Sequence, residues 1–126
     1  IDMYHNTEII GWLSRDPEYK EHPDGTRTAI LSVVTERMDH GKKNTAWFTV
    51  IADGKLVSIV SQMVHKGTLV RISGNLIPGE DGNPRLFIGT RGTEQAAYEV
   101  RAKQILVLTP KPPDDLMLDA ETEWRE

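Results

Sequence analysis

Apolar and polar residues alternate over five segments of this chain, and the alternation predicts five β-strands. The predicted strands are residues 7–13, 27–36, 45–52, 69–77 and 98–108. The pattern is clearest in residues 45–52, where Phe48, Val50 and Ala52 share one face. Trp47 falls on the opposite face, so that if Phe48 packs in a core, Trp47 points away from it.

Residues 55–65, between the third and fourth predicted strands, have the 3.6-residue period of an amphipathic helix. Its predicted apolar stripe comprises Leu56, Val60, Met63 and Val64. Gly67 follows as a suitable left-handed residue for the end of the helix. Three strands, one helix and two strands are the element order of the OB-fold, a five-stranded Greek-key barrel with a helix between strands three and four. The expected fold class is therefore mainly β.

Turn-forming residues mark the connections between these elements. Residues 14–26 contain two Pro-containing turn signals and predict a hairpin-like loop, and residues 38–44 predict a polar connection. Residues 78–97 contain a tight turn and a short strand at 85–88. They predict an extended hairpin region between the fourth and fifth strands.

From Thr109 the sequence changes to a Pro-rich linker followed by an acidic tail. We expect an OB-fold domain over residues 1–108, and a linker and tail over 109–126 that are flexible in isolation. The segment from Asp114 onward carries −5, and because the whole chain carries −4, the remainder carries +1. A near-neutral body can still present a local basic face, so net charge does not exclude a polyanionic ligand.

The chain has no cysteine, which excludes a disulfide framework and a thiolate metal site. No apolar run approaches the roughly 18 residues that span a bilayer, and no signal-peptide pattern opens the sequence. These features favour a reducing compartment. We expect a cytoplasmic protein without a membrane partner.

Residue types that carry catalysis are present but scattered. None of the four histidines has metal-ligand spacing to another ligand; they are His5, His22, His40 and His65. The sequence contains no GxSxG, no phosphate-binding GxxxxGK[ST] and no GxGxxG after a strand. It therefore predicts no catalytic residue, no metal site and no cofactor, and favours a binding protein over an enzyme.

Three aromatic residues are candidates for ligand binding: Trp47, Trp12 and Phe87. An exposed aromatic side chain on such a barrel can stack on unpaired bases, which contributes about 1–3 kcal/mol per base. Trp12 follows Gly11 on the first strand, and Phe87 lies in the extended hairpin region, where long loops of this barrel often clamp a ligand. The alternatives are that Trp47 covers a subunit interface or a barrel edge, and that Phe87 packs within its own hairpin.

Basic residues interleave with these aromatics at strand ends, on the outer face of the fourth strand and in loops. They are Arg15, Lys42, Lys43, Lys55, Arg71, Arg85 and Arg91. Such a set predicts contacts along a phosphate backbone, with an affinity that depends on salt and largely not on sequence. Each of them taken singly fits a solvated surface charge better than a phosphate contact. Only the combination with aromatic residues favours nucleic acid.

Three stretches of the chain resemble, in order and spacing, the bacterial-type single-stranded DNA-binding protein family. They are GWLSRDPEY with PDGT, TAWFTVIADGKLVSIVSQMVHKGTLVRISGNL, and YEVRAKQILVL. The resemblance implies an OB-fold that wraps single-stranded DNA, a homotetramer or dimer, association with the nucleoid, and an acidic tail that recruits replication and repair proteins. By position it implies base stacking on Trp47 and basic contacts from Lys55 and Lys66.

The chain departs from that family at several positions. Asp53 stands where the family often has an aromatic residue, and so does Met38. Trp12 falls where the family has a polar or basic residue. A carboxylate at Asp53 would repel phosphate, so we expect a different strand path or affinity there.

These patterns predict a protein that binds and protects single-stranded DNA with little sequence specificity, in replication, recombination and repair. An OB-fold interaction subunit of a larger nucleoprotein complex is the alternative, favoured by the loss of stacking platforms at Asp53 and Met38. RNA is a further possible ligand, because stacking tolerates either sugar.

Overall fold

Nine elements make up residues 1–109, the part of the chain that this computed structural model describes. They are β1 (Thr7–Leu13), β2 (Glu18–Glu21), β3 (Arg27–Asp39), β4 (Lys42–Asp53), α1 (Lys55–Met63), β5 (Leu69–Leu76), β6 (Leu86–Ile88), β7 (Glu94–Ala96) and β8 (Glu99–Thr109). The linker and acidic tail predicted for residues 109–126 lie, except for Thr109, outside the described residues.

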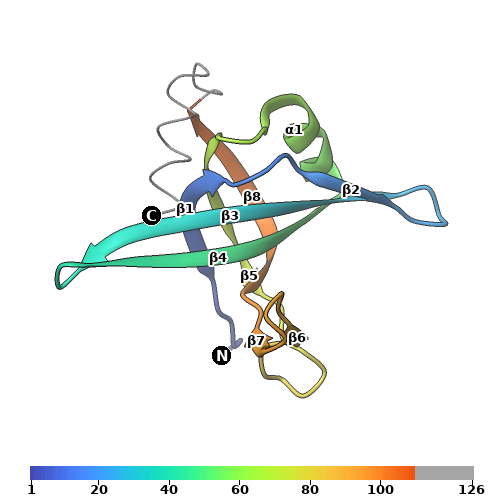
Figure 1. Cartoon of the computed structure of the whole chain (residues 1–126). Coiled ribbons are helices and arrows are strands. Elements are labelled where there is room, and N and C mark those ends of the chain that lie inside the picture. Colours follow the sequence, from blue (N-terminus) through green and yellow to red (C-terminus); the bar gives the residue numbers. More distant parts are fainter. Residues whose placement is uncertain (110–126) are drawn as a thin grey trace.

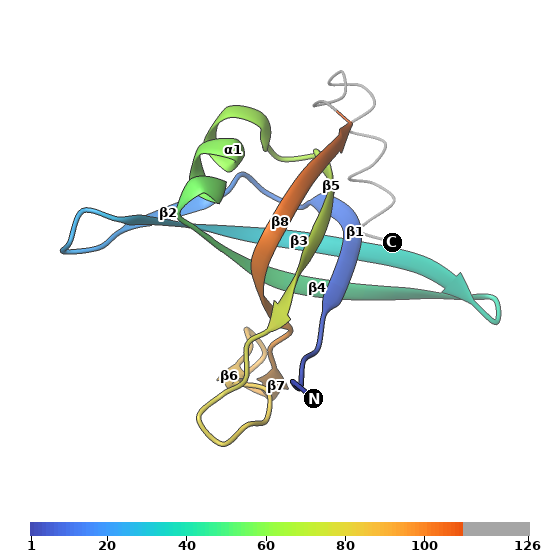
Figure 2. The same ribbon diagram turned by 180° about the vertical axis from the view of Figure 1, so that it is seen from behind.

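Five of the strands close into a barrel (Figures 1 and 2). The order in the main sheet is β1-β5-β8-β4-β3-β2, and a further pairing between β1 and β3 closes the barrel. β4 and β8 run parallel, whereas the other neighbours are antiparallel. Helix α1 lies at one end of the barrel and the β6–β7 hairpin projects from the other. The predicted mainly β, five-stranded barrel with one helix is confirmed.

The interior of the barrel is filled by aliphatic side chains, and β4 shows how the alternation positions them. Val50 and Ala52 are fully buried, and Phe48 packs against this core while partly exposed. Trp47, on the opposite face, is 53% exposed. The predicted division of β4 into a core face and an outer face is therefore confirmed.

Helix α1 packs on the barrel with a stripe that differs from the predicted one. Val57, Val60 and Val64 are buried, while Met63, predicted to face the core, is exposed. Leu56 packs against the core as predicted, and Val64, already extended beyond the helix end at Met63, is buried as well. Within residues 1–109 no helix is long and apolar enough to cross a membrane.

Two predicted connections are partly strand. The loop predicted over residues 38–44 is a two-residue turn at His40 and Gly41, both with positive φ, as in tight β-hairpins. Lys42 and Lys43 are therefore the first residues of β4 and are not in a loop. The loop predicted over 14–26 contains β2, which pairs with the start of β3. Short exposed strands of this kind carry no apolar alternation that would predict them.

Candidate nucleic-acid interface

Two tryptophans lie in one row across the outside of the barrel. Trp12 on β1 is the register partner of Val34 on β3, and Val34 is also the partner of Trp47 on β4. Directly opposed residues share a face of the sheet, so the three side chains form a row. Val34 is 0% exposed although it is outside the cluster of core side chains, whereas Trp12 is half-buried. The outer face therefore carries a Trp12–Val34–Trp47 row with a buried centre.

The close crossing of β1 and β3 makes this row possible. A Cβ on Gly11 would lie 2.4 Å from the Val34 carbonyl oxygen, so only glycine lets the two backbones approach this closely. Trp12 is the next residue and is held opposite Val34 as a result. The close approach at Gly11 thus positions one of the candidate aromatics.

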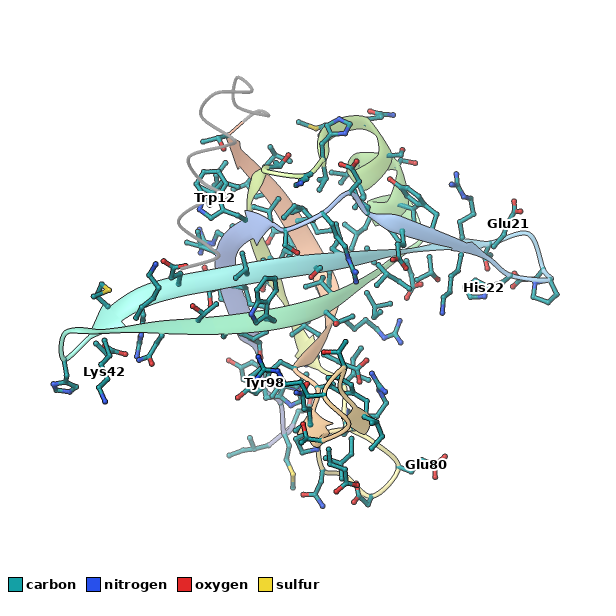
Figure 3. All side chains as sticks on the ribbon, in the orientation of Figure 1. Trp12, Glu21, His22, Lys42, Glu80 and Tyr98 are labelled. Atoms are coloured by element: carbon teal, nitrogen blue, oxygen red, sulfur yellow. The ribbon has the colours of Figure 1, made fainter. Side chains whose placement is uncertain are left out.

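A cavity of about 420 Å³ opens beside Trp47, between β4 and the β6–β7 hairpin. Phe87 from β6 and Tyr98, which precedes β8, also line it. Tyr98 was not among the sequence-based candidates. Figure 3 labels it below the β3–β4 ribbon, on the other side from Trp12. Its position at the head of a predicted strand, like that of Trp47, is the signal that identifies it.

Tyr98 is held at the edge of β4 by two contacts. Its backbone carbonyl accepts a hydrogen bond from the Thr49 N–H at 2.9 Å. Its ring lies 5.6 Å from the Phe48 ring, centroid to centroid, and the planes are tilted by 35°. Such aromatic pairs are favourable beyond their buried area. The Tyr98 ring is thus supported by the core side chain next to Trp47 in sequence.

Arg85 joins the aromatic cavity to a second hollow. Its Nε donates to Glu99 Oε1 at 2.9 Å, and its guanidinium lies 5.8 Å from the centroid of the Phe87 ring. The hydrogen bond to Glu99 raises the pKa of Arg85 above its ordinary value. Arg85 also lines a hollow of about 480 Å³ that includes Asp53. The outer face of β4 is therefore bordered by two hollows that share Arg85.

The carboxylate of Asp53 is paired within the protein. It forms an ion pair with Arg101 on β8 and accepts a hydrogen bond from the Thr28 hydroxyl at 2.6 Å. His22 Nε2 lies 2.7 Å from the same hydroxyl. Arg101 therefore offsets the charge that the sequence suggested would repel phosphate. Arg101 was not a sequence-based candidate, because nothing in the sequence connects it with a residue 48 positions earlier.

The other predicted basic residues are distributed more widely. Lys42 and Lys43 lie at the start of β4, near the tip of the β3–β4 ribbon, and Lys43 pairs with Glu36 at 3.1 Å. Arg71 forms an ion pair with Glu8 on the outer face of β5 and β1. Only Arg85 among the predicted bases lines the cavity beside Trp47.

The remaining four predicted bases lie outside that cavity. Arg15 is exposed after β1, Lys55 is the first residue of α1, and Arg91 is exposed between β6 and β7. The backbone N–H of Lys66 donates to Asp16 at 2.7 Å. Within residues 1–109 no three His, Asp or Glu side chains are grouped as metal ligands. The aromatic residues are thus better clustered than the bases.

The chain has clear relatives. The model of the family described as "Single-strand binding protein family" matches residues 4–108. The chain is 30% identical over 105 residues to the single-stranded DNA-binding protein of Neisseria meningitidis serogroup A, which covers 79% of this chain and 57% of that protein. Single-stranded DNA-binding protein 1 of Xylella fastidiosa is 30% identical over 110 residues, covering 82% of this chain and 76% of that protein.

A solved structure described as "Plasmodium falciparum SSB complex with ssDNA" has the same fold. Its TM-score is 0.66 at 18% sequence identity, and the match covers 86% of this chain and 98% of that chain. The chain spans little more than half the length of the Neisseria relative. Since the family model matches residues 4–108, most of the chain, the chain belongs to the single-strand binding protein family.

Proposed function

We propose that this protein binds and protects single-stranded DNA, with little overall sequence specificity, in replication, recombination and repair. The observation that carries the proposal is the clustering of aromatic residues on the outer face of the barrel. The Trp12–Val34–Trp47 row lies directly beside the cavity lined by Phe87 and Tyr98. Family membership and the names of the Neisseria and Xylella relatives support the same ligand.

Binding combines stacking with phosphate neutralisation. Each base stacked on an aromatic ring contributes about 1–3 kcal/mol, and a ring accepts any base because every base has a π-face. Lysine and arginine side chains along β4 and in the surrounding loops release counterions from the strand, so affinity falls as salt increases. The protein acts as a binding protein without a catalytic centre, in the cytoplasm with the nucleoid.

Tryptophan fluorescence tests this function directly. We expect titration with oligo-dT to quench the fluorescence, with a weaker apparent affinity at the higher of two salt concentrations. Competition between matched DNA and RNA oligonucleotides identifies the preferred sugar. Absence of both quenching and binding at low salt would contradict the proposal.

A second copy of the chain is the proposed protein partner of the β1–β5–β8 face. Ile10, Arg71 and Leu106 form a row across these three strands, and both apolar members are about half exposed. Covering such a row in a symmetric dimer or tetramer would remove this apolar surface from water. Light scattering at several protein concentrations determines the number of subunits. Replication and repair proteins are proposed partners of the acidic tail, whose residues lie outside the described part.

A further inference from the structure

The cavity beside Trp47 is bordered by aromatic surface from three separate segments. β4 contributes Trp47, β6 contributes Phe87, and the segment before β8 contributes Tyr98. Phe87 and Tyr98 are 37% and 56% exposed, so part of each side chain remains accessible to a ligand. With a volume of about 420 Å³, the space falls within the range of small-ligand pockets.

The side chains that line the cavity favour an uncharged ligand. Arg85 is the charged side chain in the lining, and its guanidinium is already engaged by Glu99 and by the Phe87 ring. The other lining residues are aromatic rings, alanines, threonines and one glutamine. A phosphate group would meet no unengaged cation there. A flat, uncharged, aromatic group is the chemistry that this cavity matches.

Gln95 is the residue with a carboxamide side chain in the lining of this cavity. It is the register partner of Phe87 across the β6–β7 hairpin, so both side chains lie on the hairpin face that lines the cavity. The amide packs over Gly89, where a Cβ would come within 2.7 Å of Nε2. A carboxamide supplies one acceptor and two donor hydrogens, and it can therefore match a donor and an acceptor lying side by side on the edge of a base.

We propose that this cavity takes a single nucleobase out of the bound strand and discriminates among bases through the Gln95 amide. The inference rests on the proposed function, because a strand must bind before a base can enter. The base is held by stacking on Trp47, Phe87 and Tyr98. The Gln95 amide forms hydrogen bonds with the edge of the base, as in other pockets for unstacked bases. A site that is otherwise tolerant of sequence then has one nucleotide position at which base identity changes affinity.

The test compares the affinities of oligo-dT, oligo-dA and oligo-dC strands of about ten nucleotides, within the site size of one OB-fold. It uses the whole chain and the variant Gln95→Leu, which keeps the size of the side chain and removes its hydrogen bonds. We expect the ratio of the strongest to the weakest affinity to shrink by at least about five-fold in Gln95→Leu. Gln62→Leu, on the exposed face of α1, is the matched control and should keep the wild-type ratio.

The possible results distinguish failure of the base pocket from failure of single-stranded DNA binding. Base preferences that arise from stacking strength alone would persist in Gln95→Leu, and an unchanged ratio would overturn the base pocket while leaving DNA binding intact. Equal affinities of the wild type for all three strands would overturn it as well. No binding to any strand would overturn both proposals. As a second readout, 2-aminopurine placed at successive positions should show one position of strongest quenching, and Phe87→Leu should remove that maximum.

Discussion

The middle and the C-terminal end of β4 present opposite chemistry on the same outer face. At the middle of the strand, Trp47 lies across from buried Val34 and beside a cavity lined mainly by aromatic and neutral side chains. At the C-terminal end Asp53 lies across from Thr28 and is bound to Thr28 and Arg101. Trp47 and Asp53 are only six positions apart, yet one belongs to an aromatic surface and the other to a surface of paired charges.

This difference shows that a charged residue in a binding strand must be judged together with its partners. Asp53 taken alone is a negative charge on the path of a polyanion. The Asp53–Arg101 pair is neutral, and the Thr28 hydroxyl satisfies the second carboxylate oxygen. The region around Trp47 is therefore expected to provide most of the binding energy, and the Asp53 end to contribute little in either direction.

Removing Trp47 tests the aromatic region at the middle of β4. We expect Trp47→Ala to weaken oligo-dT binding by about 1–3 kcal/mol, because one stacking platform is lost. The side chain is exposed, so thermal unfolding should change little. Binding constants from anisotropy of a labelled oligonucleotide measure the effect. Unchanged affinity would mean that Trp47 serves packing or subunit assembly instead.

Removing Trp12 tests whether the row acts as one surface. We expect Trp12→Ala to weaken binding by about 1 kcal/mol, the lower end of the stacking range, because the ring is already half-buried. Unlike Trp47→Ala, it should also lower the unfolding midpoint, since the Trp12 side chain is the more buried of the two. Paired binding and melting measurements on both variants make the comparison. A loss of stability without a loss of affinity would restrict Trp12 to packing.

Removing Arg101 tests the Asp53 end and has the smallest expected effect. Arg101→Ala leaves the carboxylate of Asp53 without its cation, and we expect binding at low salt to weaken about two- to three-fold. Adding Asp53→Asn should restore most of the affinity, because the unpaired charge is then absent. Titrations of the single and double variants form a double-mutant cycle. If the double variant binds as weakly as Arg101→Ala, Arg101 contacts the phosphates itself.

Local patterns in the sequence predict much of this architecture. The alternation around Trp47 correctly predicts which side chains of β4 face the core and which face outward. The order of the elements correctly predicts the barrel. The stacking role of Trp47 remains a prediction. Tyr98 and Arg101 were missed because their significance depends on β8 pairing in parallel with β4, a contact between segments about 50 residues apart. Register between distant strands is set by the whole barrel, and no local period encodes it.

The two-residue turn at His40 and Gly41 has a consequence for the entropy of binding. Asp39 pairs with Lys42 and Met38 with Lys43, so the backbone of both lysines is ordered before any ligand arrives. In a flexible loop, fixing each residue on a phosphate would cost about 1–2 kcal/mol of backbone entropy. Here that ordering occurs during folding. If the β3–β4 ribbon contacts the bound strand as proposed, Lys42 and Lys43 meet it on an already ordered backbone, which lowers the entropic penalty of binding.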